Sequence, residues 1–161
     1  MINPVRILVV LGCASVFGSA ISAESESMEI VIGGGPRAGT YQMPSENIFC
    51  IHLKTQNAVA ISYKDFDASG DPKKIGTAAI GVTNPDDAGP KRGSVQVSFA
   101  AAKGQDALSS SLSYSISIPG DSPGPLVITR KGKSAELSFQ GKTKDGVSVR
   151  VTANCPALED L

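Results

Sequence analysis

A glycine cluster near the start of the chain has the spacing of a dinucleotide-binding loop. Residues 33–38, Gly-Gly-Gly-Pro-Arg-Ala, follow the β-prone segment 28–32 and satisfy the pattern G-x-G-x-x-A. Pyrophosphate binding needs a helix that begins at this loop, because the free N–H groups and the dipole of its first turn face the phosphates. Residues 39–43 are instead β-prone and are followed by Pro44. The cluster is therefore predicted to connect two antiparallel strands, and no cofactor is expected.

A second segment places oxygen ligands at alternate positions. Asp65, Asp67, Ser69 and Asp71, with a glycine at the sixth place, match the first seven positions of an EF-hand-type calcium loop. The twelfth position should hold a bidentate glutamate but is Gly76, and several lysines surround the segment. The favoured interpretation is a polar hairpin loop, with a weak calcium site as the alternative. No thermal stabilisation by calcium is expected at sub-millimolar concentration.

His52 is the only histidine, so any histidine-dependent catalysis rests on this residue. Cys50 lies on the same strand face, but the two residues make only half of a zinc site. The chain contains no G-x-S-x-G motif, and nothing in the sequence points to partners of His52 in a Ser–His–Asp triad. The paired carboxylates Asp86 and Asp87 lie in a proline-rich loop, where solvated turn residues are the usual interpretation. We expect His52 to be structural and the chain not to be an enzyme.

The elements that carry these residues are short β segments separated by Gly, Pro, Asn and Asp. Turn signals recur about every 8–12 residues, and no window sustains a helical period for three turns. The pattern predicts an all-β fold, an antiparallel β-sandwich or barrel, in a single domain closed by one disulfide. A hairpin turn is expected at residues 144–146. The expected strands are residues 28–32, 40–43, 47–53, 58–64, 75–82, 94–101, 111–118, 126–130, 135–140 and 147–153.

The first 23 residues have the pattern of a secretory signal peptide. Arg6 supplies a positive charge, residues 7–20 are almost wholly apolar or small, and small residues precede a cleavage site after Ala23. The apolar run is shorter than the roughly 20 residues of a transmembrane helix, so no membrane span is expected. Cleavage would leave residues 24–161 as one exported β domain, either periplasmic or secreted.

Cysteine usage fits export. Cys13 lies within the signal segment, where the preceding Val-Leu-Gly makes a lipobox-like motif; the alternative to cleavage at Ala23 is therefore a lipid anchor on Cys13 at the cell envelope. Cys50 and Cys155 remain as an even pair in an oxidising compartment, with two separate buried thiols as the alternative.

Charge and aromatic content exclude some classes of partner. The chain has 15 basic and 15 acidic residues, so it has no electrostatic preference for nucleic acid or for an anionic membrane. Tryptophan is absent and aromatic residues make up 5% of the chain, which leaves little material for base stacking.

Two stretches of the sequence together resemble a known family. "MEIVIGG…GTYQMPSENIFC" has an early strand with glycine and then a first cysteine, and "AELSFQGKTKDGVSVRVTANC" is a terminal strand that ends in a second cysteine. This layout resembles the small mycobacterial lipoprotein antigens and related exported proteins. The resemblance implies an envelope-associated β domain with Cys50 bonded to Cys155 and no known catalysis. Residues 44–50 also resemble the Pro-Ser-Gly-Asn-Ile-x-Cys signature of a second exported group, with Glu46 in place of the glycine.

These features lead to one leading hypothesis about function. The chain is expected to be a non-enzymatic exported domain that binds a protein or an envelope component. One alternative is a small periplasmic hydrolase that depends on His52. The other is a stoichiometric inhibitor of an extracellular enzyme, which would act through an exposed loop such as residues 84–93.

Overall fold

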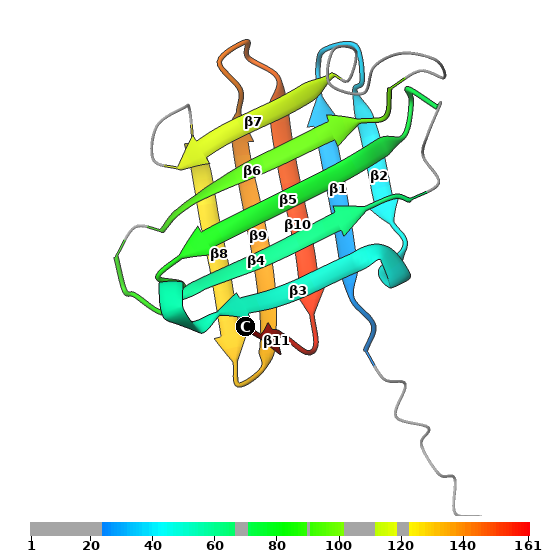
Figure 1. The fold of residues 1–161 in the computed structure, drawn as a ribbon. Helices are drawn as coiled ribbons and strands as arrows, with labels where there is room; N and C mark the ends of the chain where they lie inside the picture. The colour runs from blue at the N-terminus through cyan, green and yellow to red at the C-terminus, as the bar shows by residue number, and fades with distance from the viewer. Residues whose placement is uncertain (1–23, 67–70, 90, 102–111, 119–122) are drawn as a thin grey trace, which may run out of the picture.

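Strands form most of the fold (Figure 1). The computed structural model describes residues 24–66, 71–89, 91–101, 112–118 and 123–161. The predicted signal segment, with Ala23 and Cys13, lies outside the described residues. The elements are β1 (Ser27–Gly33), β2 (Gly39–Met43), η1 (Ser45–Asn47), β3 (Ile48–Leu53), η2 (Lys54–Gln56), β4 (Ala58–Lys64), β5 (Ile75–Thr83), β6 (Arg92–Phe99), β7 (Ser113–Ile118), β8 (Pro123–Lys131), β9 (Ser134–Lys142), β10 (Ser148–Cys155) and β11 (Glu159–Asp160).

The strands form two separate sheets. One has five strands in the order β2-β1-β10-β9-β8, and the other has six in the order β11-β3-β4-β5-β6-β7. Every pairing is antiparallel except that of β11 with β3, which is parallel. Figure 1 shows one sheet in front of the other, with the two sets of strands crossing steeply. The all-β prediction is confirmed, and of the two architectures left open the structure shows the sandwich.

The core lies between the sheets and is built from the residues that alternate along each strand. Ile30 on β1, Phe139 on β9 and Val151 on β10 are buried on the inner face of the five-stranded sheet. Ile61 on β4 and Val97 on β6 are buried on the facing sheet. Because successive side chains of a strand point to opposite faces, this period of two buries one row per strand and leaves the other row at the surface. That alternation is the signal from which the strands were predicted.

The predicted hairpin turn between β9 and β10 is also present. Gly146 has a φ of 81°, and its N–H donates a hydrogen bond of 2.9 Å to the carbonyl of Thr143. The positive φ explains the glycine at this position, since other residues adopt this conformation only at a cost. The turn sets the register of β9 against β10, in which Phe139 lies opposite Val151.

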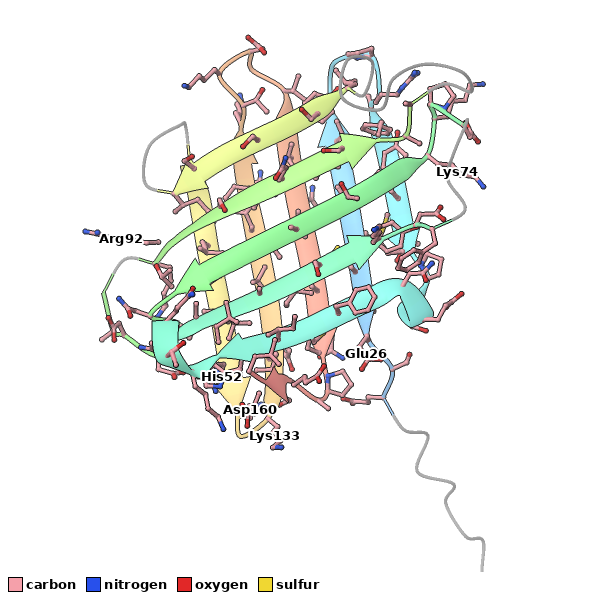
Figure 2. All side chains as sticks on the ribbon, in the orientation of Figure 1. Glu26, His52, Lys74, Arg92, Lys133 and Asp160 are labelled. Atoms are coloured by element: carbon pink, nitrogen blue, oxygen red, sulfur yellow. A yellow bond between two sulfur atoms is a disulfide. The ribbon has the colours of Figure 1, made fainter. Side chains whose placement is uncertain are left out.

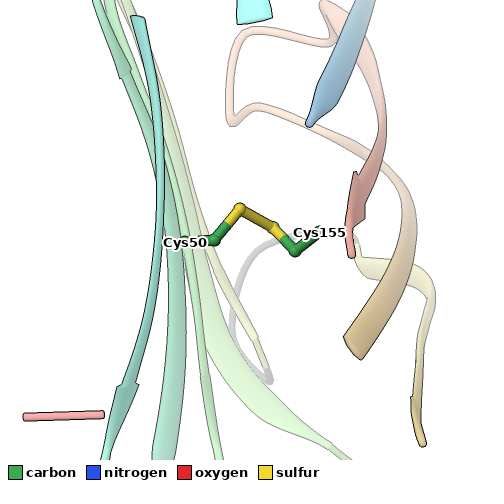
Figure 3. The surroundings of a disulfide bond; sticks show 2 residues. All are labelled: Cys50 and Cys155. Atoms are coloured by element: carbon green, nitrogen blue, oxygen red, sulfur yellow. A yellow bond between two sulfur atoms is a disulfide. The ribbon is translucent and has the colours of Figure 1, made fainter. Parts of the chain in front are cut away.

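A disulfide between Cys50 and Cys155 joins the two layers (Figure 3). Cys50 lies on β3 of the six-stranded sheet, and Cys155 is the last residue of β10 in the five-stranded sheet. Both side chains are buried, and their Cα atoms are 6.0 Å apart. The predicted pairing is confirmed, and it places the terminal strand across the sandwich from β3 rather than beside it.

One strand, β11, was not predicted from the sequence. After Cys155 the chain crosses to the six-stranded sheet and runs parallel to β3. The N–H of Leu161 donates to the carbonyl of His52 (3.0 Å), and the N–H of Lys54 donates to the carbonyl of Leu161 (3.1 Å). Leu158 is buried and anchors the crossing segment. The Glu-Asp sequence of β11 has low β propensity, so tertiary contacts form this strand rather than local preference.

We predict that removal of the disulfide weakens the fold strongly. The bond closes a loop with a sequence separation of 105, and its loss should lower the free energy of unfolding by about 2–5 kcal/mol. Urea unfolding of the wild type with and without reductant measures this loss. The Cys50→Ala/Cys155→Ala variant is the control, because its unfolding midpoint should not respond to reductant. A wild-type midpoint that is unchanged on reduction would contradict the prediction.

Candidate functional site

The glycine cluster forms the turn between β1 and β2. These two strands pair antiparallel, and Gly34 and Gly35 have φ values of 83° and 76°. The segment after the cluster is β2 rather than a helix, so the N-terminal N–H groups that would hold a pyrophosphate are not formed here. The interpretation of the cluster as a connection between antiparallel strands is confirmed.

The glycine turn closes one end of the sandwich over an aromatic cluster. Phe99 lies edge-on to Tyr41 (centroids 5.5 Å apart) and to Tyr114 (6.2 Å). The guanidinium carbon of Arg37 lies 6.0 Å from the centroid of the Phe99 ring, and the Tyr41 hydroxyl donates to the Arg37 carbonyl (3.0 Å). Burial raises the pKa of the Tyr114 hydroxyl. These contacts give the turn a role in packing.

The candidate calcium loop is only partly described. Asp67 and Ser69 lie outside the described residues, whereas Asp65 and Asp71 lie inside them. One carboxylate oxygen of Asp71 accepts a hydrogen bond from the N–H of Lys73 (3.0 Å), as in a tight polar turn. Burial, followed by the charge of Asp65, raises the pKa of Tyr63 to about 12. Within the ranges that the structure describes, no three His, Cys, Asp or Glu side chains are grouped so that they could hold a metal ion.

The structure brings His52 together with a carboxylate that the sequence did not single out. Figure 2 shows His52 and Asp160 side by side at the edge of the molecule, and Nδ1 of His52 lies 3.1 Å from Oδ1 of Asp160. The Lys54 ammonium lies 3.1 Å from the other oxygen of Asp160. Hydrogen bonds from Lys54 first, and from His52 second, lower the pKa of Asp160. The cluster holds β11 against β3.

A histidine oriented by an aspartate is also one part of a hydrolase triad. A nucleophile must lie within hydrogen-bond reach of the other ring nitrogen, and across the described ranges no serine or cysteine is hydrogen-bonded to Nε2 of His52. Cys50 is held in the disulfide and is not available as a metal ligand with His52. In the structure, the contact between His52 and Asp160 joins β11 to β3.

The paired carboxylates and the loop that carries them are tied to the body of the protein. Asp86 forms an ion pair with Arg130 on β8, with a distance of 2.6 Å between oxygen and nitrogen. The Lys91 ammonium donates to the carbonyl of Pro85 (2.7 Å) and to that of Asp87. Asp86 thus has a structural partner in Arg130.

An apolar hollow lies on the outer face of the six-stranded sheet, with a volume of about 320 Å³. We call it the aromatic hollow because Phe49 (43% exposed) and Phe66 (62% exposed) both line it. The other two phenylalanines in the described residues, Phe99 and Phe139, are buried in the core. The lining residues are Phe49, Ser62, Tyr63, Lys64, Phe66, Thr77, Ala78, Ala79 and Gln96.

The strands beside the aromatic hollow present small, uncharged side chains to the outside. The register places Ser62, Ala79 and Gln96 in one row across β4, β5 and β6, and places Ala60, Gly81 and Ser94 in the next row. We call these six residues the uncharged face. The outward charged residues of these strands, Lys64 and Arg92, lie at strand ends. Depletion of charge is a feature of the centre of protein interfaces.

The outer face of the five-stranded sheet is chemically different. A broader hollow of about 600 Å³ on this face is lined largely by carboxylate, hydroxyl and amide groups, including Glu29, Glu136, Ser138 and Thr152. Glu29 is hydrogen-bonded to the Gln42 amide on the neighbouring strand. Such a lining is typical of a solvated sheet surface, even though this hollow is the larger one. The aromatic hollow is the surface feature that solvation alone does not explain, and we treat it as the candidate site.

The sequence analysis missed the aromatic hollow, although part of its signal was present. Phe49 lies between the buried residues Ile48 and Cys50, so the period of two already places its side chain on the outer face. Phe66 lies beyond the end of β4, where no strand pattern applies. That both rings line one hollow depends on the neighbouring strands and is not readable from the chain alone.

Comparison with protein-family models, with curated proteins and with solved structures finds no match to this chain. Among the residues that the structure describes, no helix has the length and apolar character needed to cross a membrane.

We predict that Gly34→Ala and Gly35→Ala differ in their cost to stability. Both residues have positive φ, so each substitution should cost about 1–2 kcal/mol in backbone strain. At Gly35 a Cβ would also lie 3.1 Å from a methyl group of Val147 and 3.2 Å from the Tyr114 hydroxyl, whereas nothing lies within 4 Å at Gly34. Urea unfolding should show the larger loss for Gly35→Ala. Equal losses would mean that the turn does not pack on the aromatic cluster as described.

A second prediction concerns acid and the C-terminal strand. Because the folded-state pKa of Asp160 is lowered, its ion pairs stabilise β11 above the ordinary aspartate pKa, and this contribution is lost as the pH falls through the lowered pKa. In NMR spectra the amide of Lys54, which donates to Leu161, should report this loss on acidification. Asp160→Asn should show the loosened state at neutral pH, and Glu159→Gln, a change at the neighbouring carboxylate, should not. Identical spectra for wild type and Asp160→Asn would refute the prediction.

Proposed function

We propose that this chain is a non-enzymatic exported domain that binds a protein or an envelope component through the aromatic hollow and the uncharged face beside it. One observation carries the proposal: the two exposed phenylalanines among the described residues line the same hollow. Single exposed apolar side chains are common on protein surfaces and need no explanation. Two aromatic rings that converge on one hollow form the kind of anchor that dominates binding energy at interfaces.

The energetics of the site support a role in binding. Full burial of a phenylalanine side chain contributes about 1.5–3 kcal/mol relative to leaving it in water. Phe49 and Phe66 are already partly buried, so a partner that covers them gains part of this free energy. The neighbouring uncharged face adds no desolvated charge to the cost of association. Its small side chains also leave room for a close approach of the partner.

The glycine at position 81 supports the proposal that a partner covers the uncharged face. It lies in the middle of β5 without a positive φ, and nothing lies within 4 Å of the position that a Cβ would occupy. Neither a turn nor internal packing therefore requires glycine here, although glycine weakens a strand by roughly 0.5–1 kcal/mol relative to alanine. Glycine inside a strand often marks a place where another backbone or a ligand approaches closely.

Two features support export as part of the proposal. The disulfide between Cys50 and Cys155 forms and persists in oxidising compartments. The first 23 residues have the charge and hydropathy pattern of a signal peptide cleaved after Ala23. We propose a periplasmic or secreted location, with a lipid anchor on Cys13 as the alternative.

The contact between His52 and Asp160 favours one rival, a small hydrolase. Substitution of His52 separates the two functions. On the binding proposal, His52→Ala loosens β11 and leaves partner binding through the aromatic hollow intact, because His52 does not line the hollow. Detection of an ester- or peptide-hydrolysing activity that His52→Ala abolishes while the fold is retained would favour the hydrolase.

We predict that Phe49→Ala/Phe66→Ala abolishes partner binding without unfolding the protein. Both side chains are exposed, so stability should change by less than about 1 kcal/mol. Partners captured from envelope extracts by the wild type are identified and purified, and their affinity for each variant is measured by calorimetry. The double variant should bind at least about tenfold more weakly.

Val127→Ala is the matched control for this experiment. Val127 is 55% exposed and lies on the outer face of the other sheet, so its truncation removes a comparable apolar side chain from the opposite surface. It should bind like the wild type. A double variant that retains wild-type affinity for every captured partner would exclude the aromatic hollow as the binding site.

A further inference from the structure

We infer that the occupant of the aromatic hollow is an exposed segment of a protein in which a large apolar side chain lies next to a carboxylate. This inference rests on the proposed function and specifies the chemistry of the partner at the same site. It follows from the charge at the rim of the hollow, from the size of the hollow and from the shape of the surrounding face.

Charge at the rim comes from Lys64. This residue ends β4, and its ammonium nitrogen lies 5.1 Å from the centroid of the Phe66 ring. A cation at this distance from an aromatic face is held there by the ring quadrupole, so the ammonium stays beside the apolar lining. Among the described residues, no carboxylate forms an ion pair with Lys64. Of the described residues that line the hollow, it is also the only charged one.

A guest therefore meets an apolar surface with a single positive charge at its edge. A carboxylate next to the guest's apolar side chain would accept a charge-assisted hydrogen bond from the Lys64 ammonium. A basic residue at the same place would be repelled, and a neutral residue would leave the ammonium partly desolvated without compensation. Charge complementarity with Lys64 therefore favours a guest in which the residue next to the apolar side chain is acidic rather than basic or neutral.

The size of the hollow fits one large apolar side chain of the guest. Its volume of about 320 Å³ is at the lower end of the range for ligand pockets, roughly 300–1,000 Å³. The small side chains of Ser62 and Ala79 line the hollow in the same row as Phe49. These small residues leave space in the hollow for one large side chain of a guest.

The uncharged face next to the hollow fits the main chain of such a guest. Ala60, Gly81 and Ser94 form a row adjacent to the row that lines the hollow, and no side chain rises from Gly81. An extended peptide can therefore pass close to the sheet on its way into the hollow. An anionic membrane is a poorer occupant, because attraction to such a surface needs a cluster of basic residues and here one lysine lines the site.

The test is a selection of random peptides displayed on phage against the purified protein, run in parallel on four forms. The wild type should enrich peptides with a large aromatic or aliphatic residue within two positions of Asp or Glu. Lys64→Glu should enrich the same apolar residues next to Lys or Arg. Lys131→Glu, a charge reversal at an exposed position of β8, is the control and should select as the wild type does. Phe49→Ala/Phe66→Ala should enrich neither class.

Synthetic versions of the enriched peptides give the quantitative outcome. Binding of an acidic peptide to Lys64→Glu should be at least about tenfold weaker than to the wild type. Absence of an acidic preference in the wild type, the same preference in Lys64→Glu, or no enrichment at all would overturn the inference about the partner. If instead the protein selects no peptides but binds phosphatidylglycerol vesicles, and Lys64→Glu abolishes this binding, the inferred protein partner is wrong and the site binds a lipid surface. Equal binding of the peptides to Phe49→Ala/Phe66→Ala would instead overturn the proposed function.

Discussion

The disulfide between Cys50 and Cys155 is the constraint on which the other functional features of this sandwich depend. It fixes β3 over the end of β10, so that one strand of the six-stranded sheet is covalently tied to the opposite layer. The neighbouring residue on β3, Phe49, points away from the core because its inward neighbour Cys50 points into it. The disulfide on the inner side of β3 therefore restrains the strand that carries Phe49, which lines the aromatic hollow on the outer side.

The same strand lies close to the edge of its sheet and needs protection there. Unpaired edge strands expose N–H and C=O groups that pair readily with other chains. In this protein the segment after Cys155 turns back and adds β11 beside β3, where the contact of Asp160 with His52 and its ion pair with Lys54 hold it. The single histidine thus stabilises a strand edge, and the cysteine that joins the layers also directs the segment that covers this edge.

Most of the fold was predictable from the sequence because alternation along a strand is a local property. The segments from β1 to β10 each contain a row of apolar residues with a period of two, or a short apolar run between turn residues, and all were expected within a few residues. β11 was not expected, because Glu159 and Asp160 pair with residues of β3 that lie far away in the sequence. Local pattern fixes the existence of a strand, whereas the order of strands depends on contacts between distant residues.

The candidate site was less predictable for the same reason. His52 and Asp160 are separated by 108 positions, so no local pattern predicts their contact. Phe66 lies after the end of β4, so no local pattern places its ring in one hollow with Phe49.

The two outer faces of the molecule differ in charge, although they belong to one chain and meet the same solvent. The five-stranded sheet carries Glu29, Arg150 and Glu136 on adjacent strands, as a surface in permanent contact with water does. The six-stranded sheet carries no charge over the centre of β4 to β6 and adds exposed rings at one end. An uncharged sheet face with exposed rings at its edge is the kind of surface that a partner covers, and the proposed function rests on this contrast between the two faces. Under that proposal, the lysine at the rim restricts which partner binds.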